Sequence, residues 1–385
     1  MTGVHRFSGD PEVAQAWCKA WSAPVPIQLL LLLAATETAA VPGISAAGST
    51  PASRRQTAAA DAELLCNGPL GARPHALPPL PAGVSPALIS RVVVEQLALE
   101  PLVCDLGCAV APAVPHLRPM GRAAGGPAAC LSSGAALDPE RVQALLELAG
   151  RWGASLRRLG QPLLLAECVP GGTSTAQALL GGLGVEAEGL VSGSLRHPAH
   201  TLKAALVQRG LAAAGLAPPA APAEADPGAI DPAAVAAAVG DAMQPLAAGL
   251  TLAAAGAGLP VLLAGGSQMA AVLALALALA PERLRPVIAA HAAVVTTAWV
   301  AEEPGSDLEL LLTRIGVRWG VAPLAFASGL RFTGPCHPAL QAYERGYVKE
   351  GVGAGGLALL WQLRGGDPAA LAAACDRACQ QLLGG

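Results

Sequence analysis

The sequence predicts an α/β protein with a mostly parallel, Rossmann-like sheet that is flanked by helices. Short apolar runs, such as residues 27–35 and 161–166, alternate with longer helical segments along the whole chain. A strand that is buried on both faces of a parallel sheet has a continuous apolar sequence rather than an alternating one. The alternation of such strands with helices indicates βαβ units, which place helices on both faces of the sheet.

The individual elements follow from these patterns. The expected strands are residues 27–35, 102–110, 161–166, 260–264 and 287–295. The expected helices are a short one within 1–22 and those at 57–65, 85–99, 138–158, 173–183, 232–239, 268–280, 308–315, 340–348, 357–363 and 368–383. The helix at 138–158 has the clearest start, because Asp138 can cap it, Pro139 suits its first turn and Glu140 adds favourable charge there.

The bulk composition excludes several classes of protein. A chain of 385 residues exceeds the size at which one core usually stops growing, so we expect a large α/β domain with a smaller appendage. A net charge of -3 leaves no nucleic-acid footprint. The nine cysteines are odd in number, and neither Cys104/Cys108 nor Cys375/Cys379 has the spacing of a zinc site. We expect reduced thiols, no metal, no cofactor and a cytoplasmic location.

Two segments need a separate interpretation. Residues 242–281 carry no charged side chain and are long enough to cross a membrane. Prolines and glycines interrupt the segment, however, so a helix, a turn, a short strand and a second helix fit it better, and we expect no membrane contact. The Ala/Pro-rich segment at 213–227 is expected to be an exposed loop.

The strongest local motif is LLLAECVPGGTSTAQALL at residues 163–180. A strand ends at Glu167, a glycine turn follows, and a helix begins. Backbone N–H groups at a glycine turn and the positive end of a helix suit a monophosphate. The expected phosphate cradle consists of Gly171, Gly172, Thr173, Ser174 and Thr175. The alternative is an ordinary strand–turn–helix unit with hydroxyl caps.

A second motif is GYVKEGVGAGG at residues 346–356. It delivers Lys349 and Glu350 into a loop rich in glycine, where Gly351 and Gly353 would let a flat ligand approach. Burial of Glu350 among apolar groups would raise its pKa toward the range that suits proton abstraction. The alternative is a glycine-capped helix end on which Lys349 and Glu350 are solvated.

Further polar residues follow two other strands. Gly265, Gly266, Ser267 and Gln268 follow the strand at 260–264 and would line the same edge of the sheet, as candidates for a pocket that holds a flat base. The acidic residues Glu302, Glu303 and Asp307 follow Thr296 and Thr297. Their spacing matches no standard ligand set, so we expect a solvated face.

Taken together, these segments resemble the nicotinate-nucleotide–dimethylbenzimidazole phosphoribosyltransferase family, and within it the cyanobacterial and archaeal branch. The matching blocks, in order, are ISAAGSTP (44–51), DAE (61–63), ECVPGGTST (167–175), SGSL with LK (192–203), GDAMQP (240–245), LLAGGSQMAAVLAL (262–275), TTAWVAE (296–302) and YERGYVKEGVGAGG (343–356). In the last but one of these blocks, Ala298 stands where the family pattern has Arg, and a missing cation there would weaken nucleotide or acid binding.

The resemblance implies a reaction and an architecture. The phosphoribosyl group of nicotinate mononucleotide would be transferred to 5,6-dimethylbenzimidazole, giving α-ribazole 5′-phosphate and nicotinate for the cobalamin lower ligand. Glu350 matches the general base, Glu167 the acidic residue that opens the phosphate loop, and Lys203 a phosphate-contacting lysine. The whole chain, 1–385, would be one unit, with an α/β core at about 40–335, a smaller helical subdomain from about 1–25 and 336–385, and assembly as a homodimer.

Two other functions stay open at this point. The same fold could act on another base, such as adenine, because the shape of the base slot decides the acceptor. Alternatively, the chain could bind a nucleotide without catalysing a reaction. The departure at Ala298 and the insert at 213–227 keep this second alternative open. Fold analogy alone does not fix function.

Overall fold

The computed structural model describes residues 4–216 and 230–384, and within them the chain forms an eight-stranded sheet. Its order is β1-β8-β7-β6-β5-β2-β3-β4. The strands are β1 (His5–Ser8), β2 (Gln28–Leu33), β3 (Pro101–Asp105), β4 (His116–Leu117), β5 (Leu163–Cys168), β6 (Val261–Ala264), β7 (Ala292–Thr297) and β8 (Leu324–Ser328). Neighbouring strands are parallel except for β1 and β8. The predicted fold class, a mostly parallel α/β sheet, is confirmed.

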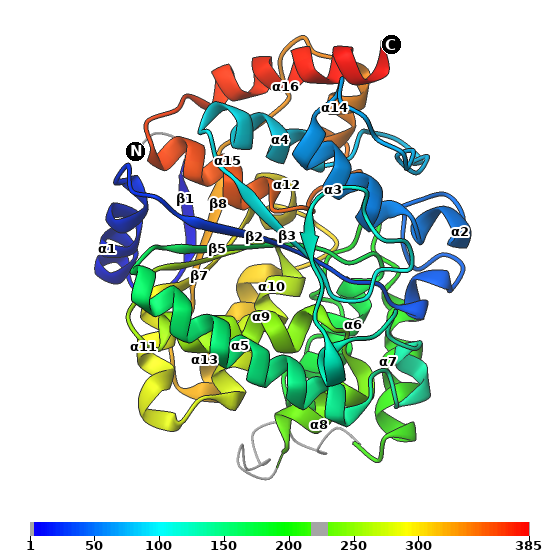
Figure 1. Ribbon diagram of the computed structural model, residues 1–385, viewed down its shortest axis with the longest axis vertical. Helices are drawn as coiled ribbons and strands as arrows, with labels where there is room; N and C mark the ends of the chain where they lie inside the picture. Colours follow the sequence, from blue (N-terminus) through cyan, green and yellow to red (C-terminus); the bar gives the residue numbers. More distant parts are fainter. Residues whose placement is uncertain (1–3, 217–229, 385) are drawn as a thin grey trace.

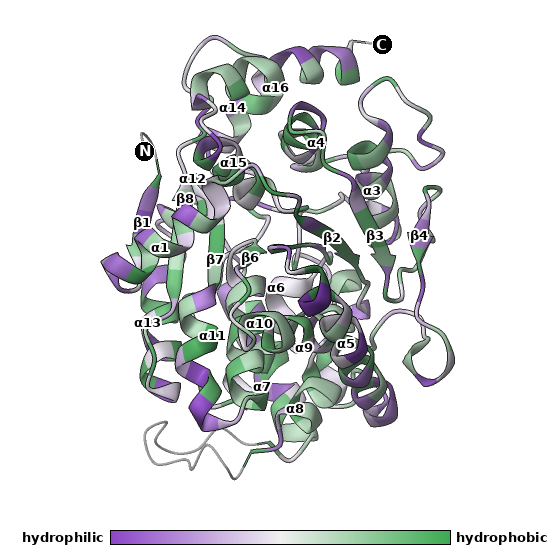
Figure 2. Ribbon diagram, turned by 60° about the vertical axis from the view of Figure 1, so that its left-hand side comes forward, coloured by the Kyte–Doolittle hydropathy of each residue, from purple (hydrophilic) through white to green (hydrophobic). Residues whose placement is uncertain are grey.

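Strand β2 shows why a central strand of this sheet is a continuous apolar run. Successive side chains of a strand point to opposite faces. Leu30 and Leu32 pack into the core on one face, whereas Leu29, Leu31 and Leu33 pack into the core on the other. In Figure 2 the central strands are mostly green, whereas edge strand β1, which carries His5 and Arg6, is largely purple. Polar edge strands discourage pairing with other chains.

One layer of helices covers the lower face of the sheet in the view of Figure 1. It consists of α5 (Pro139–Leu159), α6 (Gly172–Gly182), α7 (His200–Ala213), α8 (Pro232–Val239), α9 (Met243–Ala255), α10 (Ser267–Leu279), α11 (Arg285–His291) and α13 (Leu308–Trp319). Asp138 caps α5 as predicted, because its Oδ1 accepts a hydrogen bond of 2.8 Å from the backbone N–H of Glu140. The uncharged segment at 242–281 contains α9, β6 and α10, as predicted from its prolines and glycines.

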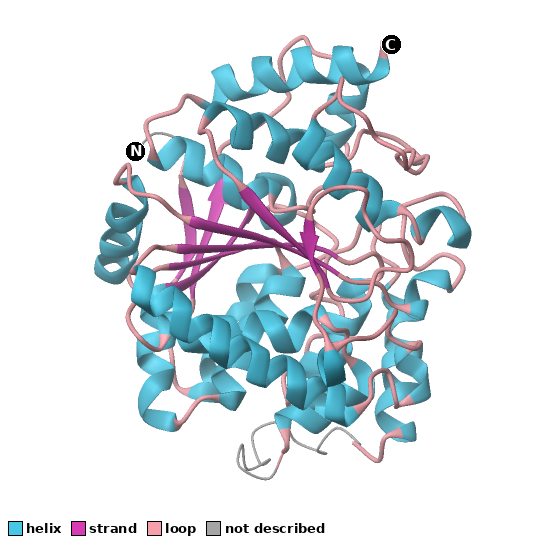
Figure 3. Cartoon of the chain, in the orientation of Figure 1, coloured by secondary structure: helices cyan, strands magenta, loops and turns pink. Residues whose placement is uncertain are grey.

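A second layer lies above the sheet in Figure 3. It contains α3 (Thr57–Asn67), α4 (Ala87–Gln96), α14 (Pro338–Glu344), α15 (Ala354–Leu363) and α16 (Pro368–Leu383), with α1 (Pro11–Ser22) beside α15 and α11. Short helices are α2 (Pro51–Arg54), α12 (Ala298–Ala301) and the 3₁₀ turns η1 (Glu37–Ala40), η2 (Gly121–Ala123), η3 (Leu131–Ser133) and η5 (Glu282–Leu284). Trp299, Phe332 and Tyr343 form an aromatic cluster in this layer, in which Trp299 stacks on Phe332 and the ring of Tyr343 is tilted against Trp299 with the centroids 4.8 Å apart.

Several predicted boundaries differ from the structure. Residues 5–8, which were expected to belong to a helical end, form edge strand β1. Strand β2, which was expected at 27–35, lies in the middle of the sheet, although it precedes the expected start of the α/β core at about residue 40. Residues 287–291, predicted as part of a strand, belong to helix α11, because an apolar run alone does not distinguish a buried helix turn from a strand. Strand β3 ends at Asp105 rather than at 110.

The described residues show neither a membrane-spanning helix nor a metal-binding cluster. Within residues 4–216 and 230–384, none of the helices has both the length and the apolar composition that crossing a bilayer requires. In the same ranges, no group of three or more His, Cys, Asp or Glu side chains is arranged to hold a metal ion. Most of the Ala/Pro-rich segment that was expected to be an exposed loop lies outside the described residues.

Candidate active site

A cavity of about 320 Å³ opens at the carboxyl-terminal edge of the sheet. Its walls come from the segments that follow β2, β5 and β6, together with the loops at 77–86, 192–194 and 348–351. The chain runs from β2 to β3 in one direction and resumes with β5 on the other side of β2. Loops that leave neighbouring strands in opposite directions open a crevice between them, and α/β proteins bind ligands there. The cavity therefore lies where the sheet topology places a binding site.

Glu167, at the end of β5, lines this cavity and is almost completely buried. Its Oε2 accepts a hydrogen bond from the backbone N–H of Val169 (3.0 Å), and its Oε1 accepts one from Nε2 of Gln268 (2.9 Å). Burial raises the pKa of Glu167 to about 8, and the nearby carboxylates of Asp241 and Glu350 add to the shift. At neutral pH the carboxyl group is thus mostly protonated.

Asp241 and Thr175 form a polar pair behind the cavity. Thr175 Oγ1 donates to Asp241 Oδ2 at 2.5 Å, and both residues are fully buried. Burial raises the pKa of Asp241 to about 6, against the effect of its hydrogen bonds. Neither residue lines the cavity, so Thr175, predicted as part of the phosphate cradle, instead supports the turn from beneath.

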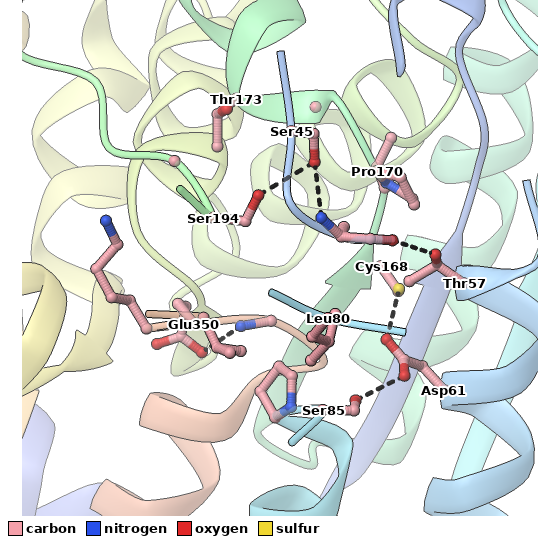
Figure 4. Close-up of a pocket in the computed structure, with 18 of the residues that line it drawn as sticks. Ser45, Thr57, Asp61, Leu80, Ser85, Cys168, Pro170, Thr173, Ser194 and Glu350 are labelled. Atoms are coloured by element: carbon pink, nitrogen blue, oxygen red, sulfur yellow. Dashed lines mark hydrogen bonds between the residues drawn. The ribbon is translucent and has the colours of Figure 1, made fainter. Parts of the chain in front are cut away.

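Glu350 lines the cavity on the same side as the apolar side chain of Leu80, across from Ser45 and Ser194, as Figure 4 shows. Its Oε1 accepts hydrogen bonds from the backbone N–H groups of Gly351 (3.0 Å) and Gly355 (3.1 Å). Its Oε2 accepts bonds from the N–H of Thr297 (2.9 Å) and the hydroxyl of Thr296 (3.1 Å). These four bonds lower its pKa, but burial has the larger effect and raises the pKa to about 6. Glu350 is thus mostly ionised at neutral pH and fixed in orientation.

The backbone that carries Glu350 is strained. Val348 and Lys349 both have a φ of 66°, and Val352 has a φ of 53°. This left-handed region is rare for any residue other than glycine and is a genuine outlier for a β-branched one. Each such residue costs on the order of 1–3 kcal/mol, which only strong tertiary contacts can offset. Strain of this kind clusters at functional sites, so it supports a functional role for the loop.

Tertiary contacts hold this loop against two strands. The backbone N–H of Val352 donates to the carbonyl of Glu167 (2.9 Å), and the hydroxyl of Thr297 donates to the carbonyl of Lys349 (2.7 Å). Gly353 packs so closely that a methyl group on it would lie 2.7 Å from Cβ of Ala166 in β5. Gly353 is therefore required for packing and does not line the cavity, whereas Gly351 does.

A second wall of the cavity carries hydroxyl groups and the predicted glycine turn. Gly171, Gly172 and Thr173 line the cavity, and Gly171 adopts a left-handed conformation with φ 82° at the start of α6. Ser45 and Ser194 face the same space, with their hydroxyl oxygens 3.1 Å apart, as Figure 4 shows. These groups and the positive end of α6 can bind an anion.

Ser174 lies beneath this turn and not on the cavity wall. It is fully buried, and its hydroxyl has no hydrogen-bond partner among the residues that the structure describes. The four remaining members of the predicted cradle therefore divide into three that line the cavity and one that does not.

The predicted phosphate lysine, Lys203, lies just behind this wall. It is buried, its Nζ donates to the carbonyl of Ser192 (2.6 Å), and it does not line the cavity. A methyl group on Gly193 would be 3.3 Å from this Nζ and 3.9 Å from Oγ1 of Thr173. Burial lowers the pKa of Lys203 to about 7. The amino group of Lys203 therefore lies directly behind Gly193, which is on the wall of the cavity that carries the hydroxyl groups.

The acidic loop after β7 was predicted to be solvated, and for Glu303 this is wrong. The Glu303 side chain is only 4% exposed and forms an ion pair with Lys349, which is 1% exposed. Among the described residues that line the cavity, Lys349 is the one cationic side chain. Glu302, by contrast, is 60% exposed and pairs with Arg331, as expected of a surface carboxylate.

Three of the four base-pocket candidates line the cavity, and Ala298 does not. Gly266, Ser267 and Gln268 line the cavity, whereas Gly265 is buried and does not line it. Gln268 contacts Glu167, and Ser267 accepts a hydrogen bond of 3.0 Å from the N–H of Ser192, so both face the polar half of the site. Ala298 is buried in α12 and does not line the cavity.

Sequence reasoning missed the wall opposite the hydroxyl groups. The proline-rich loop supplies an apolar surface there, formed by Leu77, Pro78, Pro79, Leu80, Val84 and Pro86. At one end of this surface Asp61 accepts hydrogen bonds from the hydroxyl of Ser85 (2.6 Å) and the thiol of Cys168 (3.5 Å). Figure 4 shows Asp61 and Ser85 on the same side of the cavity as Leu80. The DAE block was the only sequence signal for this group.

Comparison with known proteins finds relatives of this chain. A family model described as a phosphoribosyltransferase matches residues 88–302. The UPF0284 protein of Parasynechococcus marenigrum is 53% identical over 374 residues, which cover 96% of this chain and 90% of that protein. The UPF0284 protein of Gloeobacter violaceus is 46% identical over 369 residues, covering 95% of this chain and 91% of that protein.

A solved structure has the same fold. The crystal structure of nicotinate-nucleotide-dimethylbenzimidazole phosphoribosyltransferase from Thermus thermophilus is similar with a TM-score of 0.55 at 19% identity, covering 96% of this chain and 92% of that one. At this identity the likeness shows the fold alone. The family match and the near relatives lead to one conclusion: the chain belongs to the nicotinate-nucleotide–dimethylbenzimidazole phosphoribosyltransferase family, on the branch of the cyanobacterial UPF0284 proteins.

Proposed function

We propose that this protein transfers the phosphoribosyl group of nicotinate mononucleotide to a benzimidazole base, giving an α-ribazole 5′-phosphate and nicotinate. The observation that carries this proposal is the cavity itself, in which an ionised, fixed carboxylate faces an apolar slot while an anion site lies on the opposite wall. A flat apolar base and a nucleotide phosphate need these two kinds of surface. The homodimer implied by the family resemblance stays a prediction, which sedimentation would test.

The 5′-phosphate would rest on the turn at Gly171–Thr173 and the hydroxyls of Ser45 and Ser194, with Lys203 behind them. Binding of a dianion there would favour the charged form of Lys203, whose pKa of about 7 leaves it half protonated at neutral pH. Anchoring the phosphate far from C1′ fixes the ribose, so that positioning supplies much of the rate acceleration.

Glu350 would act as the general base. One ring nitrogen of the acceptor attacks C1′ of the ribose, the bond from C1′ to the nicotinate nitrogen breaks, and nicotinate leaves with the electron pair. The proton on the other ring nitrogen passes to Glu350. Of its four hydrogen-bond donors, three are backbone N–H groups, and only the hydroxyl of Thr296 can rotate away. The incoming N–H would therefore replace Thr296 at Oε2.

Glu167 would play a different role from the one that its charge suggested. A carboxylate beside the ribose could ease the positive charge that develops at C1′, but a pKa of about 8 leaves Glu167 mostly protonated at neutral pH. A neutral carboxyl group donates a hydrogen bond instead. Two carboxyl groups with separated pKa values, one ionised and one protonated, are a common arrangement in acid–base sites.

A second acceptor class is favoured by one specific observation. Asp61 and Ser85 place a carboxylate and a hydroxyl at one end of the otherwise apolar slot. The methyl groups of 5,6-dimethylbenzimidazole would add no hydrogen bond to this carboxylate, whereas a base with an amine or hydroxyl there could donate to it beside Ser85 and Cys168. Adenine and hydroxybenzimidazoles meet this condition.

The deciding experiment is a turnover assay of the purified protein with nicotinate mononucleotide, comparing 5,6-dimethylbenzimidazole, 5-hydroxybenzimidazole and adenine as acceptors. We expect the wild type to release nicotinate, and Glu350→Gln to reduce turnover by roughly 10²-fold or more, because Gln cannot accept the proton. Glu188→Gln, which changes an exposed carboxylate, is the control. Nucleotide binding without product from any acceptor would instead indicate a non-catalytic binding protein.

A further inference from the structure

The ion pair between Lys349 and Glu303 joins three segments that are far apart in the sequence. Lys349 Nζ contacts Glu303 Oε1 and also donates to the carbonyl of Leu195 (2.7 Å). Glu303 Oε2 in turn accepts hydrogen bonds from the hydroxyls of Ser192 and Ser306, the latter at 2.7 Å. The loop that carries Glu350 is thereby tied to the wall at 192–195 and to the loop after α12.

The position of Lys349 in the chain means that this contact affects the backbone next to Glu350. It directly precedes Glu350 and adopts a left-handed backbone conformation, with φ 66°. A flexible lysine in solvent would not hold such a conformation, whereas an ammonium with a buried carboxylate and a carbonyl as partners restricts the backbone next to Glu350. The Lys349 carbonyl is fixed as well, by the hydroxyl of Thr297 at 2.7 Å. Both ends of the residue are thus anchored.

The ion pair is also linked by charge to the wall at 192–194. Glu303 interacts electrostatically with both Lys349 and Lys203, and Lys203 holds the carbonyl of Ser192. Ser192 and Ser194 in this segment line the cavity. The two lysines and the carboxylate therefore form one buried cluster, which lies between the loop of Glu350 and the wall that can bind an anion.

We propose that the Lys349–Glu303 ion pair is a positioning clamp, which sets the distance and orientation of Glu350 relative to the anion-binding wall at 192–194. This inference rests on the proposed function, because it assumes that Glu350 removes a proton from a substrate that the same wall anchors. The pair itself does not contact the reacting atoms. It acts through the backbone of residue 349 and through the hydroxyl of Ser192.

The test uses the full-length double variant Lys349→Met/Glu303→Gln, since removing both charges of a buried pair avoids leaving one of them unpaired. Hydrogen exchange of residues 346–353 is measured in the free protein, and steady-state kinetics are measured over a range of pH. Glu302→Gln is the matched control, because it neutralises the neighbouring carboxylate, which is 60% exposed.

The clamp predicts faster exchange in the loop, a kcat lowered by about 10- to 100-fold, and a KM for the nucleotide changed by less than about threefold. The acidic limb of kcat/KM should move below pH 6, because a looser loop lets water reach Glu350 and lowers its pKa. A merely structural pair would change the melting temperature without moving this limb. Unchanged exchange with kcat within twofold of the wild type would overturn the proposal.

Two further readouts keep the result unambiguous. If the double variant does not fold, Ser306→Ala removes one hydrogen bond from Glu303 while the ion pair stays, and it should give smaller changes in the same directions. No effect of Ser306→Ala on either exchange or kcat would then count against the clamp. If the wild type itself shows no turnover, the proposed function fails, and the exchange measurement alone still tests whether the pair holds the loop.

Discussion

Two glycine-rich segments meet at the cavity, and they are built in opposite ways. The turn at 170–173 follows a regular strand and begins a regular helix, with Gly171 as its one left-handed residue. The loop at 346–353 has left-handed conformations at glycine and non-glycine residues alike, including Val348 and Lys349. The first segment needs little beyond local sequence to form. The second forms only because strands, a helix and a buried ion pair hold it.

Glycine-to-alanine substitutions in the two segments should lower the free energy of unfolding by different amounts, and this is the largest effect on stability that we expect. Gly353→Ala introduces a methyl group 2.7 Å from Cβ of Ala166 at a φ of 74°, where two strands prevent relaxation. We expect the free energy of unfolding to fall by about 2–4 kcal/mol, from overpacking and left-handed strain together. Urea unfolding measures it.

Two further glycines provide the comparison. Gly171→Ala brings a methyl group 3.0 Å from the backbone nitrogen of Ala39, a looser approach than the 2.7 Å at Gly353, so we expect a smaller loss. Gly160→Ala has a φ of 64° with nothing within 4 Å, so it should show only the conformational cost of about 1–2 kcal/mol. Equal losses at Gly353 and Gly160 would contradict the close packing of the loop.

Glu167 contacts both segments, because its carbonyl accepts a hydrogen bond from Val352 and its carboxyl group accepts one from Val169. Its protonation state is therefore the next property to test. Its pKa is raised from 4.5 to about 8 in the folded protein, so unfolding releases a proton between these values. The free energy of unfolding should therefore fall as pH rises from about 5 to 8. Glu167→Gln cannot ionise and should lose less stability over this range, by an amount on the order of a few kcal/mol.

The measurement is thermal or urea unfolding of both proteins at several pH values. Exposed Glu188→Gln serves as the control and should follow the wild type. A difference between wild type and Glu167→Gln that does not change with pH would mean that Glu167 is ionised throughout, and its assignment as a hydrogen-bond donor would have to be abandoned.

The smallest expected effect concerns the acceptor slot. Asp61→Leu replaces the buried carboxylate with an apolar side chain of similar size and should raise the preference for 5,6-dimethylbenzimidazole over 5-hydroxybenzimidazole. We expect the ratio of kcat/KM values to change by roughly tenfold, because the substitution removes the acceptor to which the hydroxyl of 5-hydroxybenzimidazole would donate a hydrogen bond. Leu80→Ala, which alters the apolar wall, should weaken both bases similarly. An unchanged ratio in Asp61→Leu would show that the far end of the base does not reach Asp61.

The sequence predicted the regular parts of the site well and the irregular parts poorly. Glu167, the glycine turn and Gln268 directly follow apolar runs, and the carboxyl ends of parallel strands meet at one edge, so their proximity was predictable. Glu303 was placed in solvent because an acidic run after a strand usually is solvated. Its buried position depends on Lys349, which is 46 residues further along the chain.

The sequence by itself thus determined the fold class and strands β2, β3, β5, β6 and β7, and it predicted the edge at which ligands would bind, because apolar periodicity and helix caps act over a few residues. Only the tertiary structure decided which carboxyl groups are protonated, which lysine lines the cavity and which lies behind it, and how the strained loop is held. Those properties depend on burial and on contacts between distant segments, and no local pattern of residues encodes them.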